Sequence, residues 1–109
     1  MEHYGLTDAT YARLRYMQRY LASSGYRLTV RSGRRDSVEQ GSLYFRYITG
    51  QTDVPAAPPG QSAHERGEAF DVRASSGGLH LAAGLAPYIG LRWGGTFSRP
   101  DPNHFELRR

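Results

Sequence analysis

Three side chains that can bind a metal ion occur in two short segments of the chain. His64 lies seven residues before Asp71, and His104 follows later in the sequence. Around Asp71 and His104, apolar and polar residues alternate, which is the pattern of β-strands whose apolar side chains face the core. Asp71 and His104 must then project from the opposite face. If the two strands are neighbours in a sheet, these side chains converge there, and His64 can fold back to join them.

This set of two imidazoles and one carboxylate is typical of catalytic metal sites. Zinc with three nitrogen or oxygen ligands from the protein keeps a fourth position for water and lowers the pKa of that water to about 7, whereas a structural zinc site is closed by four ligands. The chain contains no cysteine, which excludes thiolate zinc sites, iron–sulfur clusters and disulfides. The residues themselves leave open whether the ion is zinc or another divalent cation.

Two further side chains are placed where hydrolysis would need them. Asp101 lies three residues before His104, so its carboxylate can lie beside the metal without being a ligand and can act as a general base. Arg35 follows a turn at Ser32 and Gly33, after the first expected strand. A guanidinium fixed there can stabilise the oxyanion that forms when a carbonyl is attacked, or bind a substrate carboxylate.

Hydrophobic periodicity, capping residues and proline positions predict the elements that carry these side chains. In chain order we expect a helix from Thr7 and Asp8 to Gly25, a strand over 26–31, a helix from Asp36 or Ser37 to Gly50, a proline-rich loop over 51–61, a strand over 68–73, an alanine-rich helix over 79–89 and a strand over 104–107. This order predicts an α+β fold in which a small antiparallel sheet has helices packed on one face.

Length and composition indicate one soluble domain. The 109 residues suffice for a modest core and show no repeat or linker, so we expect a single domain over 1–109 without a separate binding domain. No segment resembles a signal peptide or a membrane span, so we expect synthesis in the cytoplasm and no membrane insertion. The formal net charge of +4 favours a polyanionic partner. The basic residues are spread along the chain, which argues against a nucleic-acid-binding module.

Three motifs resemble those of the peptidoglycan metallopeptidases that include D-alanyl-D-alanine carboxypeptidases and phage L-alanyl-D-glutamate endopeptidases. Residues 62–71, SAHERGEAFD, match the signature SxHxxGxAxD. Residues 90–95, GLRWGG, and 101–106, DPNHFE, are similar to the family's GLxWGG and DxxHFE segments. Residues 32–44 are similar to its SGxR, EQ and LY stretch. The resemblance extends over about 28–107, in the family's order.

The resemblance implies a role for each residue of the expected site. It implies one zinc ion bound by His64, Asp71 and His104, a catalytic carboxylate at Asp101, and a substrate or transition-state contact from Arg35. It also implies the D-alanyl-D-alanine carboxypeptidase or Hedgehog-like fold, with the zinc cleft on the face of the sheet opposite the helices.

Three further residues of the motifs are expected at or near the substrate. Ser62 is expected to make a hydrogen bond near the site, and Trp93 to form a wall of the cleft. Gln40 is expected either to contact the substrate or to support the residues that do.

The resemblance implies zinc-dependent hydrolysis of peptide bonds in peptidoglycan stem peptides. Family carboxypeptidases often carry Glu where Asp101 stands, whereas the phage endopeptidases carry Asp, which favours an L-Ala–D-Glu endopeptidase that acts as a phage lysin or a virion-associated peptidase. A D-Ala-D-Ala carboxypeptidase is the alternative. A third interpretation, from another class, is a virion structural or assembly protein that retains the peptidase fold. The expected partners are peptidoglycan and other virion proteins.

Overall fold

The computed structural model describes residues 3–108, so Met1, Glu2 and Arg109 of the expected domain lie outside the described residues. The elements in chain order are α1 (Asp8–Ser23), β1 (Thr29–Ser32), α2 (Ser37–Ile48), β2 (Ala69–Arg73), α3 (Ser76–Leu85), the 3₁₀ helix η1 (Ala86–Ile89), β3 (Leu91–Trp93), the 3₁₀ helix η2 (Gly94–Thr96) and β4 (His104–Leu107). The predicted α+β architecture is confirmed.

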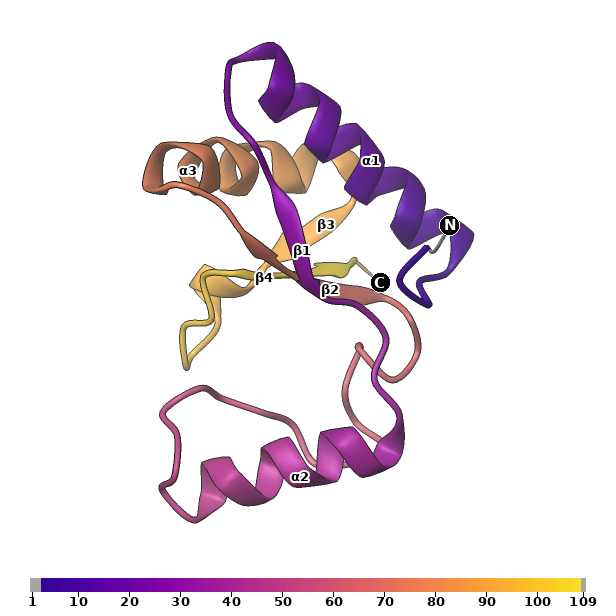
Figure 1. The fold of residues 1–109 in the computed structure, drawn as a ribbon, viewed down its shortest axis with the longest axis vertical. Coiled ribbons are helices and arrows are strands. Elements are labelled where there is room, and N and C mark those ends of the chain that lie inside the picture. The colour runs from indigo at the N-terminus through magenta and orange to yellow at the C-terminus, as the bar shows by residue number, and fades with distance from the viewer. Residues whose placement is uncertain (1–2, 109) are drawn as a thin grey trace.

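The four strands form one antiparallel sheet in the order β1-β2-β4-β3. Helices α1 and α3 cover one face of this sheet, whereas α2 lies beyond the opposite face (Figure 1). The core therefore forms between the sheet and the first of these layers. Its fully buried large side chains from the sheet and α1 are Phe70, Val72, Leu91, Phe105, Leu14, Met17 and Leu21.

The first helix follows its sequence pattern closely. The Thr7 side chain caps α1 by accepting a hydrogen bond from the Thr10 backbone N–H. Leu14, Met17 and Leu21 recur at helical spacing and are completely buried. The chain leaves the helix through Gly25, whose φ of +85° suits glycine. The predicted helix is confirmed.

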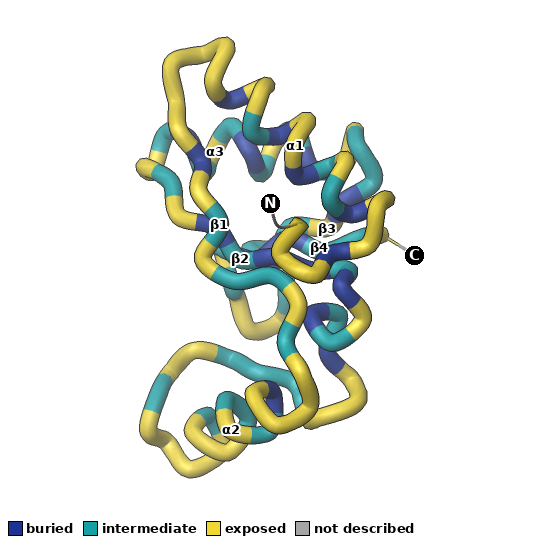
Figure 2. Tube along the Cα trace, turned by 45° about the vertical axis from the view of Figure 1, so that its right-hand side comes forward, coloured by how far each residue is buried: buried dark blue, intermediate teal, exposed yellow. Residues whose placement is uncertain are grey.

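Helix α2 starts where the sequence predicts but does not contribute to the main core. Asp36 and Glu39 form a reciprocal capping box, in which each side chain accepts a hydrogen bond from the other residue's backbone N–H. Apolar side chains of the helix remain exposed, with Val38 at 81% and Ile48 at 57%. Its buried residue is the polar Gln40. Helix α2 and the 51–61 loop thus form a separate layer that does not pack on the sheet (Figure 2).

Two element boundaries differ from the prediction. Strand β1 begins at Thr29 rather than at residue 26, because Thr29 pairs with Arg73 and β2 ends there. Helix α3 begins at Ser76, because the Ser75 side chain caps it, and becomes the 3₁₀ helix η1 around Pro87. Proline cannot donate the backbone hydrogen bond that an α-helix needs at this position.

Strand β3 was not predicted, because three residues are too few to show a periodic pattern. It pairs with β4 through Leu91 and Leu107 and through Trp93 and Phe105. Among residues 3–108, no helix combines the length and the apolar character that crossing a membrane requires.

Candidate metal centre and catalytic cleft

The sheet brings the three predicted metal ligands together on its open face. Asp71 of β2 and His104 of β4 are direct partners in the strand register. His64 reaches them from a turn that ends at Gly67, which has a φ of +71°. The candidate ligand atoms of His64, Asp71 and His104 all lie within 4.8 Å of one another.

The spacing of the two imidazole nitrogens fits tetrahedral zinc, and each nitrogen lies close to a different oxygen of Asp71. His64 Nε2 lies 3.3 Å from His104 Nδ1 and 3.3 Å from Asp71 Oδ2, and His104 Nδ1 lies 3.2 Å from Asp71 Oδ1. Tetrahedral ligands about 2.0–2.1 Å from zinc are separated from one another by about 3.3–3.4 Å. The two imidazoles can therefore bind one zinc ion, and one oxygen of Asp71 completes a set of three ligand atoms within 4.8 Å of one another.

Hydrogen bonds on the far side of each imidazole select the nitrogen that faces the centre. His64 Nδ1 donates to the Gly33 carbonyl over 2.7 Å, which leaves Nε2 for a metal. His104 Nε2 donates to Glu106 Oε1 over 2.7 Å, which leaves Nδ1. Sequence reasoning missed Glu106, although its position two residues after His104 on a strand places both side chains on one face.

Asp71 is held as a carboxylate. Its Oδ2 accepts hydrogen bonds from Ser32 Oγ over 2.8 Å and from Arg35 Nη2 over 2.7 Å. Burial alone would raise the pKa of Asp71, but hydrogen bonds with His104 and His64 outweigh burial and hold the pKa well below its usual range. Ser32 is thus a second supporting residue that was not predicted as one.

Negative charge surrounds His104 even though the residue is buried. Burial lowers its pKa, but hydrogen bonds with Asp71 and Glu106 outweigh this effect and raise the pKa to about 9. The hydrogen bond from His104 lowers the pKa of Glu106 in turn. Two ionised carboxylates around these imidazoles make a site suited to a cation.

Asp101 lies beside the ligand set without belonging to it. Its Oδ2 is 3.9 Å from His104 Nδ1. Burial and the neighbouring charge of Asp71 raise the pKa of Asp101 above its ordinary value. The Asp101 backbone N–H donates to the Gly94 carbonyl over 2.9 Å, and a Cβ at Gly94 would collide with the Asp101 carbonyl. Glycine at this position therefore lets the loop bring the carboxylate to the centre.

Arg35 is fixed by three side chains and is only partly exposed. Besides Asp71, it donates to Gln40 Oε1 over 3.1 Å and to Ser32 Oγ over 3.3 Å. Gln40 is buried, and its Nε2 donates to the Ala57 carbonyl over 2.8 Å. Gln40 therefore holds Arg35 in place and ties the 51–61 loop to α2.

The two remaining predicted residues have different surroundings. Ser62 is buried in the cleft lining, and its Oγ accepts a hydrogen bond from the His64 backbone N–H over 3.1 Å. Trp93 does not line the cleft, contrary to expectation. Its Nε1 donates to the Pro102 carbonyl over 2.7 Å, and its indole packs against Gly95. Trp93 therefore supports the loop that carries Asp101, because the alternation of β3 turns its ring away from the cleft.

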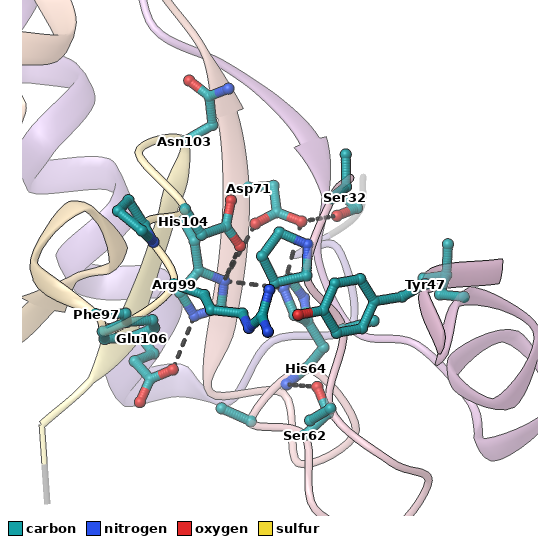
Figure 3. Close-up of a pocket in the computed structure, with 18 of the residues that line it drawn as sticks. Ser32, Tyr47, Ser62, His64, Asp71, Phe97, Arg99, Asn103, His104 and Glu106 are labelled. Carbon is teal, nitrogen blue, oxygen red and sulfur yellow. Dashed lines mark hydrogen bonds and ion pairs between the residues drawn. The ribbon is translucent and has the colours of Figure 1, made fainter. Parts of the chain in front are cut away.

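A cleft of about 1200 Å³ contains the centre. Helix α2 and the 51–61 loop form one side, and the open face of the sheet with the loop after η2 forms the other (Figure 3). A space of this size accommodates a short peptide.

Comparisons with solved structures identify the fold. VanYB in complex with D-alanine-D-alanine matches with a TM-score of 0.79 at 17% identity, covering 95% of this chain and 72% of that chain. A mutant of the D,D-pentapeptidase VanY from the VanB-type resistance cassette, solved with Zn(II), matches with a TM-score of 0.75 at 16% identity, covering 94% and 72%. The L-Ala D-Glu endopeptidase ChiX from Serratia marcescens matches with a TM-score of 0.67 at 23% identity, covering 94% and 80%.

The expected D-alanyl-D-alanine carboxypeptidase fold is thus confirmed. The chain spans 58% of the length of the LdcB LD-carboxypeptidase and 50% of that of the D,D-dipeptidase VanXYg. Comparison with curated protein sequences gives no significant match. Residues 3–93 match the family described as VanY, D-alanyl-D-alanine carboxypeptidase. The chain therefore belongs to the VanY family of D-alanyl-D-alanine carboxypeptidases, in agreement with its sequence motifs.

Proposed function

We propose that the protein is a zinc-dependent peptidase that hydrolyses a peptide bond in the stem peptides of bacterial peptidoglycan. The observation that carries this proposal is the cluster of His64, Asp71 and His104, whose candidate ligand atoms lie within 4.8 Å of one another, with Asp101 Oδ2 3.9 Å from His104 Nδ1. Zinc bound there would supply a Lewis acid that polarises the scissile carbonyl and activates the attacking water.

Asp101 acts as the general base and then as the general acid. It takes a proton from the attacking water, whose oxygen forms a bond to the carbonyl carbon. As the C–N bond breaks, the same proton passes to the leaving nitrogen, which departs as an amine. A raised pKa suits a carboxyl that must both accept and return a proton.

Arg35 contributes positive charge beside the reacting carbonyl. Its guanidinium lines the cleft and is held by Asp71, Gln40 and Ser32, so little reorganisation is needed when negative charge develops on the carbonyl oxygen. Ser62 positions His64 through the backbone rather than through the ring.

The bond that we propose as the substrate is the one between L-Ala and D-Glu. The aspartate at position 101 of the DxxHFE motif supports this choice, and the endopeptidase ChiX has a similar fold. The D-Ala-D-Ala bond is the second candidate, because the matching family is that of D-alanyl-D-alanine carboxypeptidases. We further propose a phage lysin or virion-associated peptidase as the setting. Cytoplasmic expression should then leave cells intact until their membrane is permeabilised.

Digestion of purified peptidoglycan tests the proposal. The zinc-loaded protein is incubated with isolated walls, and the new termini are identified by mass spectrometry. New D-Glu amino termini support the endopeptidase, and release of D-Ala supports the carboxypeptidase. His64→Ala serves as the control without a metal site. If the wild type binds no zinc and cleaves no more than this control, the peptidase proposal is wrong and an assembly role for the fold is favoured.

A further inference from the structure

Residues 3–7 form an N-terminal turn that precedes α1 and lies against the metal site. The His3 carbonyl accepts a hydrogen bond from the Leu6 backbone N–H over 2.9 Å, which closes the turn. Leu6 is buried in the core, and the His3 ring stacks on the ring of Tyr11 in α1, with 3.9 Å between the ring centroids. The N-terminal turn is therefore anchored to the rest of the molecule by its own side chains.

One peptide group joins the N-terminal turn to a metal ligand. The Gly33 carbonyl accepts the hydrogen bond from His64 Nδ1 that leaves Nε2 for zinc. The N–H of the same peptide group belongs to Arg34 and donates to the Tyr4 carbonyl over 2.9 Å. Because a peptide group is planar, the bond to Tyr4 fixes the direction in which the Gly33 carbonyl points. It also polarises that carbonyl, which makes it a stronger acceptor for the imidazole.

The N-terminal turn packs closely on both segments that hold the imidazole. A Cβ at Gly33 would collide with the Tyr4 carbonyl. Gly67 ends the turn that carries His64, and a Cβ there would lie 2.8 Å from a carbonyl of the N-terminal turn. The Thr7 backbone N–H donates to the Gly67 carbonyl over 3.0 Å. A change in the N-terminal turn is thus felt at the metal ligand.

Tyr4 has a backbone conformation that tyrosine rarely adopts. Its φ is +56°, and among residues 3–108 no other residue except glycine has a positive φ. This conformation is unfavourable for a residue with a Cβ, and the Tyr4 side chain is 39% exposed, so burial of the ring compensates for it only in part. Gly5 follows with a φ of +70°. Two successive positive φ values are typical of a type I′ turn, in which Asn-Gly is the preferred sequence.

We propose that the N-terminal turn is a positioning element of the metal site: the Tyr4 carbonyl, acting through the Gly33–Arg34 peptide group, holds the His64 imidazole for zinc. The backbone conformation of Tyr4 has this role, and its ring does not. The inference rests on the zinc site of the proposed function but not on which bond is cleaved. Disruption of the N-terminal turn should weaken zinc binding although every ligand is still present.

Two substitutions of Tyr4 test the proposal by calorimetric titration of the metal-free proteins with zinc. Tyr4→Asn and Tyr4→Pro both remove the ring, but Asn before glycine suits a positive φ, whereas proline fixes φ at about −65°. Tyr4→Asn should bind zinc as tightly as the wild type. Tyr4→Pro should bind zinc about 10-fold more weakly, because support for a ligating imidazole is worth about 10- to 100-fold in metal affinity.

The His64 Nδ1–H proton gives a second measurement, by NMR of the zinc-loaded proteins. This proton is protected from exchange with water while it is donated to the Gly33 carbonyl. In Tyr4→Pro it should exchange about 10-fold faster than in the wild type, because the carbonyl is no longer held in place. In Tyr4→Asn the exchange rate should equal that of the wild type.

Control variants separate positioning from a general loss of stability. Ala82 is buried in α3, which covers the face of the sheet opposite the metal site. Ala82→Gly should unfold at a lower urea concentration but keep the zinc affinity and the His64 proton exchange of the wild type. If Tyr4→Pro does not fold, Gly5→Ala takes its place, because it disfavours the same turn less severely, and the same weakening is expected.

Two outcomes would overturn the positioning role while leaving the peptidase proposal intact. The first is equal zinc affinity in Tyr4→Pro, or in Gly5→Ala where it is used, and in Tyr4→Asn. The second is an Ala82→Gly variant that loses as much zinc affinity as the turn variant does. A wild type that binds no zinc overturns both the positioning role and the proposed function.

Discussion

Replacing Glu106 by Gln should change the pH dependence of zinc binding. In the wild type, the Glu106 carboxylate accepts a 2.7 Å hydrogen bond from His104 Nε2. Together with Asp71 it outweighs burial and raises the pKa of His104 to about 9. A Gln side chain still accepts this hydrogen bond but carries no charge. The pKa of His104 should therefore fall, and the imidazole should become a weaker ligand.

The magnitude follows from competition between zinc and a proton at His104. With a pKa of about 9, roughly one imidazole in a hundred is neutral at pH 7, so the apparent zinc affinity is about 100-fold below its limit at high pH. His104 should release about one proton per zinc at pH 7. In Glu106→Gln, affinity above pH 9 should fall by about 10- to 100-fold, because the partner of a ligating imidazole has lost its charge. The difference in zinc affinity between Glu106→Gln and the wild type should become smaller toward pH 6, because protons compete less strongly with zinc for His104 in the variant.

Calorimetric titration with zinc at several pH values measures this effect. Buffers with different ionisation enthalpies give the number of protons released together with the affinity. Arg92→Gln is the matched control, because Arg92 Nη1 lies 3.6 Å from Glu106 Oε2 and its removal leaves the carboxylate in place. The reasoning is refuted if Glu106→Gln releases as many protons as the wild type, or if the ratio of their affinities is the same at pH 6 and pH 9.

Four further predictions rest on the same contacts. Asp101→Asn should lower kcat by about 10²- to 10⁴-fold in a steady-state assay while zinc content stays unchanged. Because burial and Asp71 raise the pKa of Asp101, wild-type activity should be lost, as pH falls, at a higher pH than an ordinary aspartate would give. Protonated His104 should stabilise the metal-free protein by about 3 kcal/mol below about pH 6.5, and this stabilisation should be lost as pH rises through about 9. Urea unfolding of the metal-free wild type and of His104→Gln measures the effect. Gln40→Ala should lower the free energy of unfolding by about 1–3 kcal/mol and reduce kcat/KM, because it leaves Arg35 Nη1 and the Ala57 carbonyl without their partner. An unchanged free energy of unfolding and unchanged kinetics would contradict the role of Gln40 in holding Arg35.

Local sequence predicts the helix starts well because their stabilising contacts are local. The Thr7 cap of α1 and the capping box of Asp36 and Glu39 each join groups within three residues of one another. Which segments a helix packs against, in contrast, depends on residues that are distant in the sequence. Val38 and Ile48 look like core residues in the sequence but are exposed, because α2 packs beside the 51–61 loop rather than on the sheet. Strand β3 exists only because β4 is there to pair with it.

The sequence by itself determined which residues make up the candidate metal site. Alternation along the two strands places Asp71 and His104 on the face away from the core, and the short spacing of His64 and Asp101 from these residues adds them to the site. The tertiary structure decided how these groups are arranged. The imidazole orientation of His64 depends on a carbonyl 31 residues away, and the strand register aligns two ligands 33 residues apart.

The tertiary structure alone also decided which arginines are engaged and which are free. Arg35 is held by Asp71 across the sheet, Trp93 faces away from the cleft, and Arg99 meets Tyr47 from the opposite wall. Residue types and their periodicity specify the face of an element on which a side chain lies. The partner that it meets there depends on how distant segments pack, and no local pattern encodes that packing.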